Sequence, residues 1–404
     1  MRSKSISGIL FVGMFAVLPQ VAASSGPLDT WHPRDSKTED QALNDIVYGT
    51  GLFVAVGSGG TIVTSTDGAN WTPQNSGTTA NIELIAYGSG IFLAMGVSSN
   101  PTYSIVRSDD GTNWTSSAWA PEGVYPMSGL AFANDRFFVL SDSFQENRRH
   151  AAVIFSSTDT TNWTRIDTRQ LGVPYSVIYA NSHYVALGEG PSVFPGCPGS
   201  IPFILTSGDA VTWNSSYLFS PLFCGMRFGG VAFGRNVFVA VFGAVGGGGI
   251  MSSPDGTSWT FRLSGLPVGH VAFGDGIFAA AGAEGLLVTS TDGLNWIARD
   301  PGTNYWLDGV AYGQNTFVVV GSQGIIIQSD PIVTLGLTPG VSTELSLSGP
   351  AGRNCEIQAL DQLLLANTWQ TIGTITLTNS AVSWIDADSR TNKPQRFYRA
   401  VLQP

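Results

Sequence analysis

Short apolar runs separated by glycine, asparagine and aspartate recur along most of the chain. The clearest unit is IVYGTGLFVAVGSGGTIVTSTDGANW, from Ile46 to Trp71, in which runs rich in β-branched and aromatic residues alternate with turn residues. Such runs predict β-strands, because these side chains suit a pleated surface, while glycine and aspartate suit tight turns. No long stretch has the apolar period of an amphipathic helix. We therefore expect an all-β protein.

The unit returns along the chain, which makes seven copies in all. They span residues 46–71, 85–114, 130–163, 177–213, 231–259, 271–296 and 310–331. One such sheet cannot bury both faces alone, so the units must pack radially, as the blades of a propeller do. The pattern predicts a seven-bladed β-propeller over residues 24–331.

The seventh copy ends at Ser329-Asp330-Pro331 without the tryptophan that closes the other six. A matching piece lies near the N-terminus, where Thr30-Trp31-His32-Pro33 resembles Asn70-Trp71-Thr72-Pro73. We expect this N-terminal segment to form the outer strand of the seventh blade. Such a ring, closed by both chain ends, leaves only short and protected sheet edges.

The pattern changes after Pro331. Segments such as STELSLS, WQTIGTITLT and RFYRAVL alternate apolar and polar residues, which is typical of strands with one buried face. We expect residues 332–404 to form a small C-terminal β-sandwich domain.

The first residues indicate export. Arg2 and Lys4 precede an apolar run that is too short to span a membrane comfortably, and Val21-Ala22-Ala23 suits cleavage, so residues 1–23 read as a signal peptide. The net charge of −10 disfavours nucleic acid and anionic lipid as partners. We expect a secreted or cell-surface protein, a monomer without membrane insertion after signal removal, whose partner is an extracellular glycan or protein.

The motif Ser-x-Asp-Gly-x-x-Trp occurs at the turns that begin at Ser65, Ser108, Ser253 and Ser290, and it resembles a shortened Asp-box. Residues 28–331 are thereby similar to the Asp-box (BNR-like) propellers, which include sialidases, certain xyloglucanases and photosystem-assembly propellers. The resemblance implies hairpins between the third and fourth strands of each blade, and no particular reaction. The ending of the chain is similar to C-terminal modules of secreted bacterial proteins.

The motif has a structural explanation. Its aspartate can accept backbone N–H bonds, its glycine tolerates the left-handed conformation, and its tryptophan can fill the gap to the next sheet. Thr160 and Ala210 replace the glycine in the third and fourth copies. A metal site would need the carboxylates to converge, whereas they lie on separate blades. We expect no metal and no cofactor.

Loop lengths are uneven between the second and third strands. Blades 1, 6 and 7 have tight turns, whereas blades 2, 3 and 4 carry the insertions VSSNPTYS, SDSFQENRRHAA and GEGPSVFPGCPGSIP. In a propeller these loops share one face with the links between blades, and we call it the insertion-bearing face. Long loops on a rigid scaffold favour recognition, with tolerated drift as the alternative. Cys197 and Cys224 would meet on this face, which favours a disulfide, while Cys355 suits a buried position.

The residues four before each inner-strand aromatic are expected at the mouth of the central channel. They place Asp308, Asp45 and Glu83 in an acidic arc on blades 7, 1 and 2, with His270 beside it on blade 6. Paired carboxylates would act as acid and nucleophile, or acid and base, on a glycosidic bond. Acidic residues at loop ends are also commonly just solvated, so both interpretations stay open.

Other side chains of this face suit ligand binding, since aromatic rings stack on sugars and arginine binds carboxylates. The candidates are Glu146, Arg148, Arg149, His150, Tyr175, Glu189, Tyr305 and Trp306. Alternatively, the same residues pack the loops down. A sialidase would need an arginine triad, and Arg136, Arg165 and Arg227 match it only loosely.

Three functions remain from the sequence. The first is a secreted recognition propeller that binds an extracellular polymer, with a glycan as the expected ligand. The second is a glycan-degrading enzyme that uses the carboxylates of the channel mouth. The third is a scaffold that assembles with another exported protein.

Overall fold

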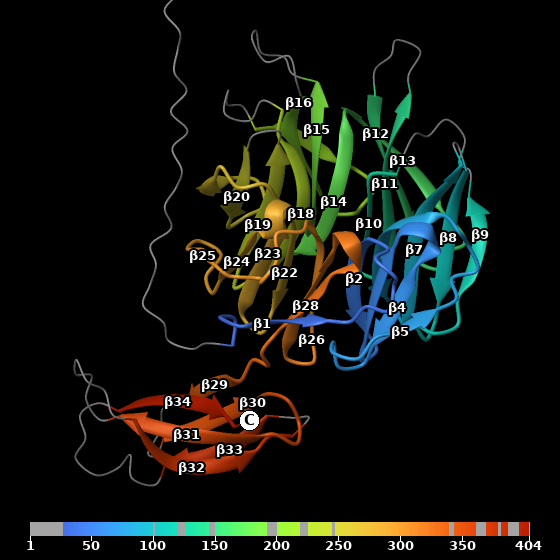
Figure 1. The fold of residues 1–404 in the computed structure, drawn as a ribbon. Coiled ribbons are helices and arrows are strands. Elements are labelled where there is room, and N and C mark those ends of the chain that lie inside the picture. The colour runs from blue at the N-terminus through green and yellow to red at the C-terminus, as the bar shows by residue number, and fades with distance from the viewer. Residues whose placement is uncertain are drawn as a thin grey trace, which may run out of the picture.

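The computed structural model describes residues 27–99, 102–119, 121, 127–144, 150–191, 200–218, 225–244, 247–338, 343–360, 369–378, 381–386 and 396–403. Seven four-stranded antiparallel sheets form in this part of the chain, and they are the blades of a propeller (Figure 1). The predicted all-β, seven-bladed fold is therefore confirmed. The predicted signal peptide, residues 1–23, lies outside the described residues.

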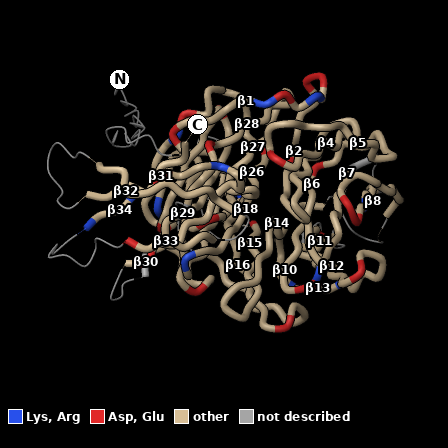
Figure 2. The backbone as a smooth tube through the Cα atoms, turned by 90° about the horizontal axis from the view of Figure 1, so that it is seen from below, with Lys and Arg blue, Asp and Glu red and all other residues tan. Residues whose placement is uncertain are grey.

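The first six blades follow the chain in order, each strand pairing with the next. Blades 1 to 3 are β2 (Leu43–Gly49), β3 (Leu52–Gly57), β4 (Ile62–Ser65) and β5 (Thr72–Gln74); β6 (Asn81–Gly88), β7 (Ile91–Ser99), β8 (Thr102–Ser108) and β9 (Thr115–Trp119); β10 (Gly129–Ala133), β11 (Arg136–Phe144), β12 (His150–Ser157) and β13 (Thr164–Leu171). Blades 4 to 6 are β14 (Val173–Ala180), β15 (His183–Pro191), β16 (Ser200–Ser207) and β17 (Asn214–Tyr217); β18 (Arg227–Gly234), β19 (Val237–Ala244), β20 (Gly247–Ser253) and β21 (Thr260–Ser264); β22 (Val268–Gly274), β23 (Ile277–Gly282), β24 (Leu287–Ser290) and β25 (Ile297–Ala298). The first strand of each blade contacts the first strand of the next, and together these strands surround the central axis of the propeller. Figure 2 shows the propeller from below.

The tight turns predicted for blades 1, 6 and 7 are single turns of 3-10 helix. They are η1 (Ser58–Gly60), η3 (Ala283–Gly285) and η4 (Ser322–Gly324). Their middle residues have left-handed backbone angles, with φ of 65° at Gly59, 56° at Glu284 and 58° at Gln323. The second and third strands of these three blades are therefore joined by short turns at the insertion-bearing face.

Both chain ends close the seventh blade. Its sheet consists of β26 (Leu307–Gly313), β27 (Thr316–Gly321), β28 (Ile326–Ser329) and, as outer strand, β1 (Trp31–Arg34). Trp31 pairs with Ser329 in the antiparallel register. Its indole N–H donates to the carbonyl of Leu28 at 3.0 Å, as the Trp71 indole N–H does to Gly68 at 3.0 Å. The predicted closure by the N-terminal strand is confirmed.

The Ser-x-Asp motifs form hairpins between the third and fourth strands of blades 1 to 6. In blade 1, one oxygen of Asp67 accepts the N–H groups of Ala69 and Asn70, each at 2.8 Å, and the Ser65 hydroxyl at 2.9 Å. Burial alone would raise the pKa of Asp67, but these donors outweigh burial and hold the pKa at about 2. The carboxylates therefore act within their own turns. Thr160 and Ala210, which replace glycine, keep the same turn at φ of 64° and 62°.

Neighbouring blades are packed through an aromatic ring against a glycine. The ring of Phe132 on β10 covers Gly88 on β6 so closely that a Cβ there would lie 2.0 Å from it. Tyr87 covers Gly49 in the same way at 2.3 Å. Each of these rings also packs on a buried phenylalanine of its own blade, as Tyr87 does on Phe92 at 4.5 Å between centroids. Side chains at these positions therefore belong to two blades at once.

The segment after Pro331 forms two three-stranded sheets. One contains β29 (Thr334–Thr338), β30 (Thr343–Ser348) and β33 (Val382–Asp386); the other contains β32 (Gln370–Thr376), β31 (Asn354–Leu360) and β34 (Phe397–Leu402). They enclose a separate apolar core that includes Leu345, Ile357 and the buried thiol of Cys355. The sandwich lies below the propeller in Figure 1, on the side of the motif hairpins.

Replacing Gly88 by alanine tests the contact between blades. We expect the Gly88→Ala variant to lose about 2 kcal/mol of unfolding free energy, because the new methyl group overlaps the Phe132 ring. Gly208→Ala is the control, since a Cβ there meets nothing within 4 Å. Chemical denaturation of both variants measures the difference. Equal stability of the two variants would contradict the packing argument.

Replacing Trp31 by alanine tests the closure of the ring. Trp31 is 7% exposed and packs in the core between blades 6 and 7. We expect Trp31→Ala to cost about 3 kcal/mol of unfolding free energy. Trp306→Ala, at a tryptophan that is 60% exposed, should cost far less. A Trp31→Ala protein as stable as the parent would rule out a closing role for β1.

Candidate functional site

The inner strands are interrupted near the insertion-bearing face by β-bulges. The register shifts on the first strands of blades 1, 2, 4, 5, 6 and 7. The unpaired residues are Asn44, Glu83, Tyr175, Gly229 with Gly230, Gly269 and Asp308. These are the positions that the sequence placed at the channel mouth. A bulge turns a side chain out of the ladder, so this ring is where the scaffold can present chemistry.

Asp45 connects blade 1 to blade 2. Its carboxylate accepts the N–H of Ile46 at 2.8 Å and, across the gap between blades, the N–H of Ile85 at 3.0 Å. The side-chain amide of Asn44 donates to the carbonyl of Ile82 at 2.8 Å beside it. Burial raises the pKa of Asp45 to about 7, although both N–H donors act in the opposite direction. Both oxygens of Asp45 are thus engaged in holding the two inner strands together.

The other members of the predicted arc, Glu83, Asp308 and His270, lie at or next to these β-bulges. Burial lowers the pKa of His270 to about 4 and raises that of Asp308, and no neighbouring charge contributes to either shift. Glu83 is exposed. Asp45, Glu83, Asp308 and His270 therefore occupy one end of adjacent inner strands, but no hydrogen bond or ion pair joins any two of them. Their catalytic role stays a prediction.

A hydrogen-bonded cluster lies across blades 4 and 5 on the same face. Glu189 at the end of β15 has a side chain that is only 8% exposed. Its Oε1 accepts the Tyr175 hydroxyl at 2.5 Å and forms an ion pair with Nε of Arg227 at 3.1 Å, and its Oε2 accepts the Ser200 hydroxyl. Burial, followed by the bond to Glu189, raises the pKa of the Tyr175 phenol. The structure therefore brings together Tyr175 and Glu189, both predicted as ligand-binding residues.

Sequence reasoning missed the role of Arg227 in this cluster. It had considered this residue only as part of an arginine triad. Its place as the first residue of β18, just before the Gly229-Gly230 bulge, was a usable signal for a side chain at the mouth. Its partner could not be found in the sequence, because the two residues are on different blades.

Two exposed aromatic residues lie on the link between blades 6 and 7. Tyr305 is 47% exposed and Trp306 is 60% exposed. Their backbone is fixed: the Tyr305 carbonyl accepts the N–H of Gly285 at 2.8 Å, and the Trp306 carbonyl accepts the N–H of Ser322 at 3.0 Å. The rings are thus presented to solvent from an anchored backbone.

Several predicted residues cannot be placed. Glu146, Arg148 and Arg149, together with both cysteines of the predicted disulfide, Cys197 and Cys224, lie outside the described residues. His150 begins β12, where its backbone pairs with Phe144.

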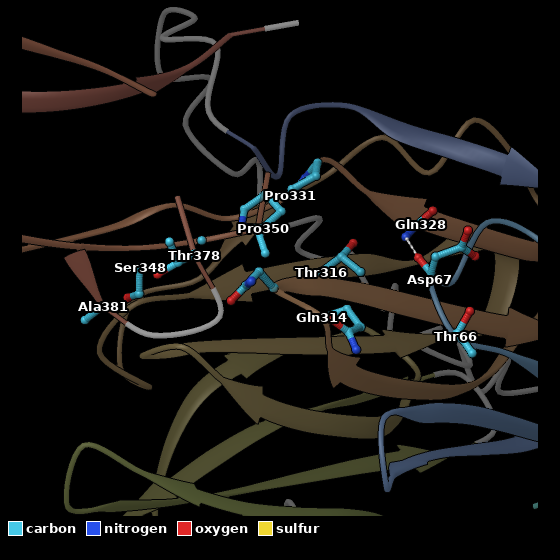
Figure 3. A pocket seen from close by; sticks show the side chains of 13 residues that line it. Thr66, Asp67, Gln314, Thr316, Gln328, Pro331, Ser348, Pro350, Thr378 and Ala381 are labelled. Carbon is cyan, nitrogen blue, oxygen red and sulfur yellow. Dashed lines mark hydrogen bonds between the residues drawn. The ribbon is translucent and has the colours of Figure 1, made fainter. Parts of the chain in front are cut away.

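A cavity of about 400 Å³ lies on the opposite side of the propeller, against the sandwich (Figure 3). Its walls come from the blade 1 hairpin, the first turn of blade 7 and loops of the sandwich, and Asp67 is the single charged residue among them. The Asp67 carboxylate accepts backbone N–H groups of its own turn. The side-chain amide of Gln328 donates to the backbone carbonyl of Asp67 at 2.7 Å. The cavity therefore offers uncharged polar groups and no group suited to acid–base chemistry.

Two features are absent from the described residues. No helix in this part of the chain is long and apolar enough to cross a membrane. Within the same ranges, His, Cys, Asp and Glu form no group of three or more that could hold a metal ion.

Comparison with known proteins bears on the fold. No protein-family model matches the chain, and no curated protein matches it. Among solved structures, the chain is similar to one described as YCF48 bound to D1 peptide, with a TM-score of 0.55 and 16% sequence identity. The match covers 76% of this chain and 96% of that chain. The chain is thus a β-propeller, by its own sheets and by this likeness.

Replacing Asp45 by asparagine tests its partly buried carboxyl. Its pKa is about 7 in the folded protein and about 4 when unfolded, so the folded state binds more protons between these values. The stability that Asp45 contributes should therefore fall as the pH rises from 4 to 7. We expect the unfolding free energy of the parent, relative to Asp45→Asn, to fall by about 2 kcal/mol between pH 5 and pH 8.

Asp67→Asn is the control for this titration. The pKa of Asp67 is lowered to about 2, so its contribution is present above pH 4 and is lost as the pH falls toward 2. Denaturation curves of Asp67→Asn should therefore run parallel to those of the parent between pH 5 and pH 8. A parallel curve for Asp45→Asn as well would show that Asp45 is not buried as described.

Proposed function

We propose that this protein is a recognition propeller that binds a glycan on its insertion-bearing face. The observation that carries this proposal is the pair of exposed aromatic residues, Tyr305 and Trp306, on a backbone anchored to two neighbouring blades. Aromatic rings that are held in place can stack on a sugar without a further cost of ordering. A predicted signal peptide over residues 1–23 supports an extracellular polymer as ligand.

The surroundings of the two rings favour a sugar over a large protein partner. Protein interfaces usually have a contiguous apolar centre, whereas the other large apolar side chains exposed on the described blades are elsewhere. Val211 and Leu294 lie in hairpins of the opposite face, and Ile297 lies on the outer strand β25. Two aromatic rings among polar groups match a site for sugar rings better.

The channel mouth supports binding more than turnover. A glycosidase needs two carboxyl groups that face one bond. The oxygens of Asp45 accept backbone N–H groups instead, and no hydrogen bond or ion pair joins Asp45 to Asp308 or Glu83. We therefore favour a binding function over a catalytic one.

A protein ligand is the second candidate, and one observation favours it. The similar propeller was solved with a peptide bound, as its description states. A scaffold that binds a segment of another exported protein would use the same face. The two candidates differ in the class of polymer that is retained.

Retention on polysaccharides tests the proposal. We expect the exported protein to be held by at least one polymer in a panel of insoluble glycans, and Trp306→Ala to bind it at least tenfold more weakly, equivalent to about 1.4 kcal/mol. Val211→Ala is a matched control, because Val211 is also 60% exposed but lies on the opposite face.

Reducing-end release is followed in the same samples. Retention without release supports the binding protein, while release that is lost in Asp45→Asn or Asp308→Asn would make it an enzyme. Failure to bind any polymer would overturn the glycan proposal and favour the peptide-binding candidate.

A further inference from the structure

The ion pair between Arg227 and Glu189 is unlike the others in the described part of the chain. The Arg227 side chain is 72% exposed, whereas its partner carboxylate is 8% exposed. In the pairs that fasten segments together, the arginine is itself covered: Arg299 is 16% exposed and Arg396 is 9% exposed. Arg227 thus forms an ion pair with a buried carboxylate, while most of its side chain is exposed to solvent.

The hydrogen bonds of Glu189 explain how the guanidinium is held. The carboxylate accepts the hydroxyls of Tyr175 and Ser200 on its two oxygens, so it is fixed in position, and Nε of Arg227 lies 3.1 Å from Oε1 in the ion pair. The ion pair joins Nε of Arg227 to Oε1 of Glu189. The two Nη groups of Arg227, with four N–H donors, make no hydrogen bond within the described residues. A fixed, planar set of free donors is suited to neighbouring oxygen atoms of a ligand.

Space for a ligand lies next to this arginine. The unpaired positions of blades 5 and 6 are glycines, and Gly229 lies against Gly269 so closely that a Cβ on Gly229 would be 1.9 Å from the Gly269 carbonyl oxygen. In contrast, a Cβ on Gly269 would meet nothing within 4 Å. The next blade link after Gly269 carries Tyr305 and Trp306. The inner strand of blade 6, which lies between the blade of Arg227 and the link that carries the two aromatic residues, therefore leaves open space at Gly269.

The charges of the mouth decide which ligand fits. Glu189 neutralises Arg227, Asp142 is close enough for its charge to act on the Tyr175 phenol, and the described ionisable groups near the bulges are Asp308, Asp45 and Glu83, beside His270. An anionic sugar would be repelled by these carboxylates. Hydroxyl groups of an uncharged sugar would accept from the Nη donors without that repulsion.

We propose that Arg227, positioned by Glu189, binds the hydroxyl groups of a neutral sugar in the open space at Gly269. This inference rests on the proposed glycan-binding function and adds to it the class of sugar and a specificity-determining residue. Trp306 and Arg227 then flank one binding site on blades 5 to 7.

The variant Arg227→Lys separates this role from a structural one. Lysine keeps a positive charge near Glu189 but lacks the planar Nη donors. We expect the affinity for a neutral polymer to fall about tenfold, with the thermal midpoint unchanged within about 2 °C. Arg235→Lys is the control, since Arg235 is on the same blade but in a hairpin of the opposite face. Gly269→Trp should also abolish binding by filling the opening, whereas Gly208→Trp on the opposite face should not.

The ligand class is tested with polygalacturonate and the same polymer after carboxyl reduction, which differ in having a carboxylate or an uncharged hydroxymethyl group at C6 of each sugar. We expect binding to the reduced, neutral polymer, or to neutral glucan, xylan or mannan, and little to polygalacturonate. Preference for polygalacturonate, or an unchanged affinity in both Arg227→Lys and Gly269→Trp, would overturn this inference while leaving glycan binding in place. Absence of binding to every polymer would overturn the proposed function and this inference together.

Discussion

Each blade is fastened to the next by an aromatic ring that lies on a residue with little or no side chain. Gly88 accommodates Phe132, Gly274 accommodates Tyr312, and Gly313 of the last blade accommodates Tyr48 of the first. A methyl group at any of these glycines would overlap the ring, so the spacing between inner strands is set by this contact. Because the last of these contacts joins blade 7 to blade 1, the same interaction that spaces the blades also closes the ring.

The closed ring explains why the ends of the chain matter. In blades 1 to 6, the motif hairpin is continuous, whereas in blade 7 its first part is Ser329 and its last part is Trp31. The chain leaves at that interrupted hairpin, and Ile332 is still buried in the propeller core, with its N–H donating to the Asn315 carbonyl at 2.6 Å. Val333 already packs in the sandwich core. Since consecutive residues belong to the two cores, the sandwich is attached without a free linker, on the face away from the channel mouth.

Much of this architecture was predictable from the sequence, because each repeat forms its strands and turns from residues that are close together in the chain. The spacing of turns and tryptophans predicted seven blades, and the likeness of residues 30–33 to residues 70–73 predicted β1. The residues four before each inner-strand aromatic, predicted at the channel mouth, coincide with β-bulges that the sequence did not predict. The site was less predictable, since it depends on which residues of different blades meet. Asp45 bonds to the backbone of Ile85, and Glu189 bonds to Arg227, and neither partner has a fixed spacing in the chain. The insertions, which differ from blade to blade, have no repeat to guide an interpretation.

The difference between the regular repeats and the irregular side chains at their bulges affects what the channel mouth can bind. A regular ring would present the same side chain seven times, but the bulges present an amide, carboxylates, a phenol and glycines in turn. On blades 7, 1 and 2 the carboxyl groups lie near inner strands, where Asp45 is used to join two blades. On blades 4 and 5 the buried carboxylate of Glu189 instead leaves a guanidinium facing outward. Carboxylates thus join blades on both sides of the mouth, and on the side of blades 4 and 5 the arrangement also leaves a guanidinium facing solvent beside the open space at Gly269.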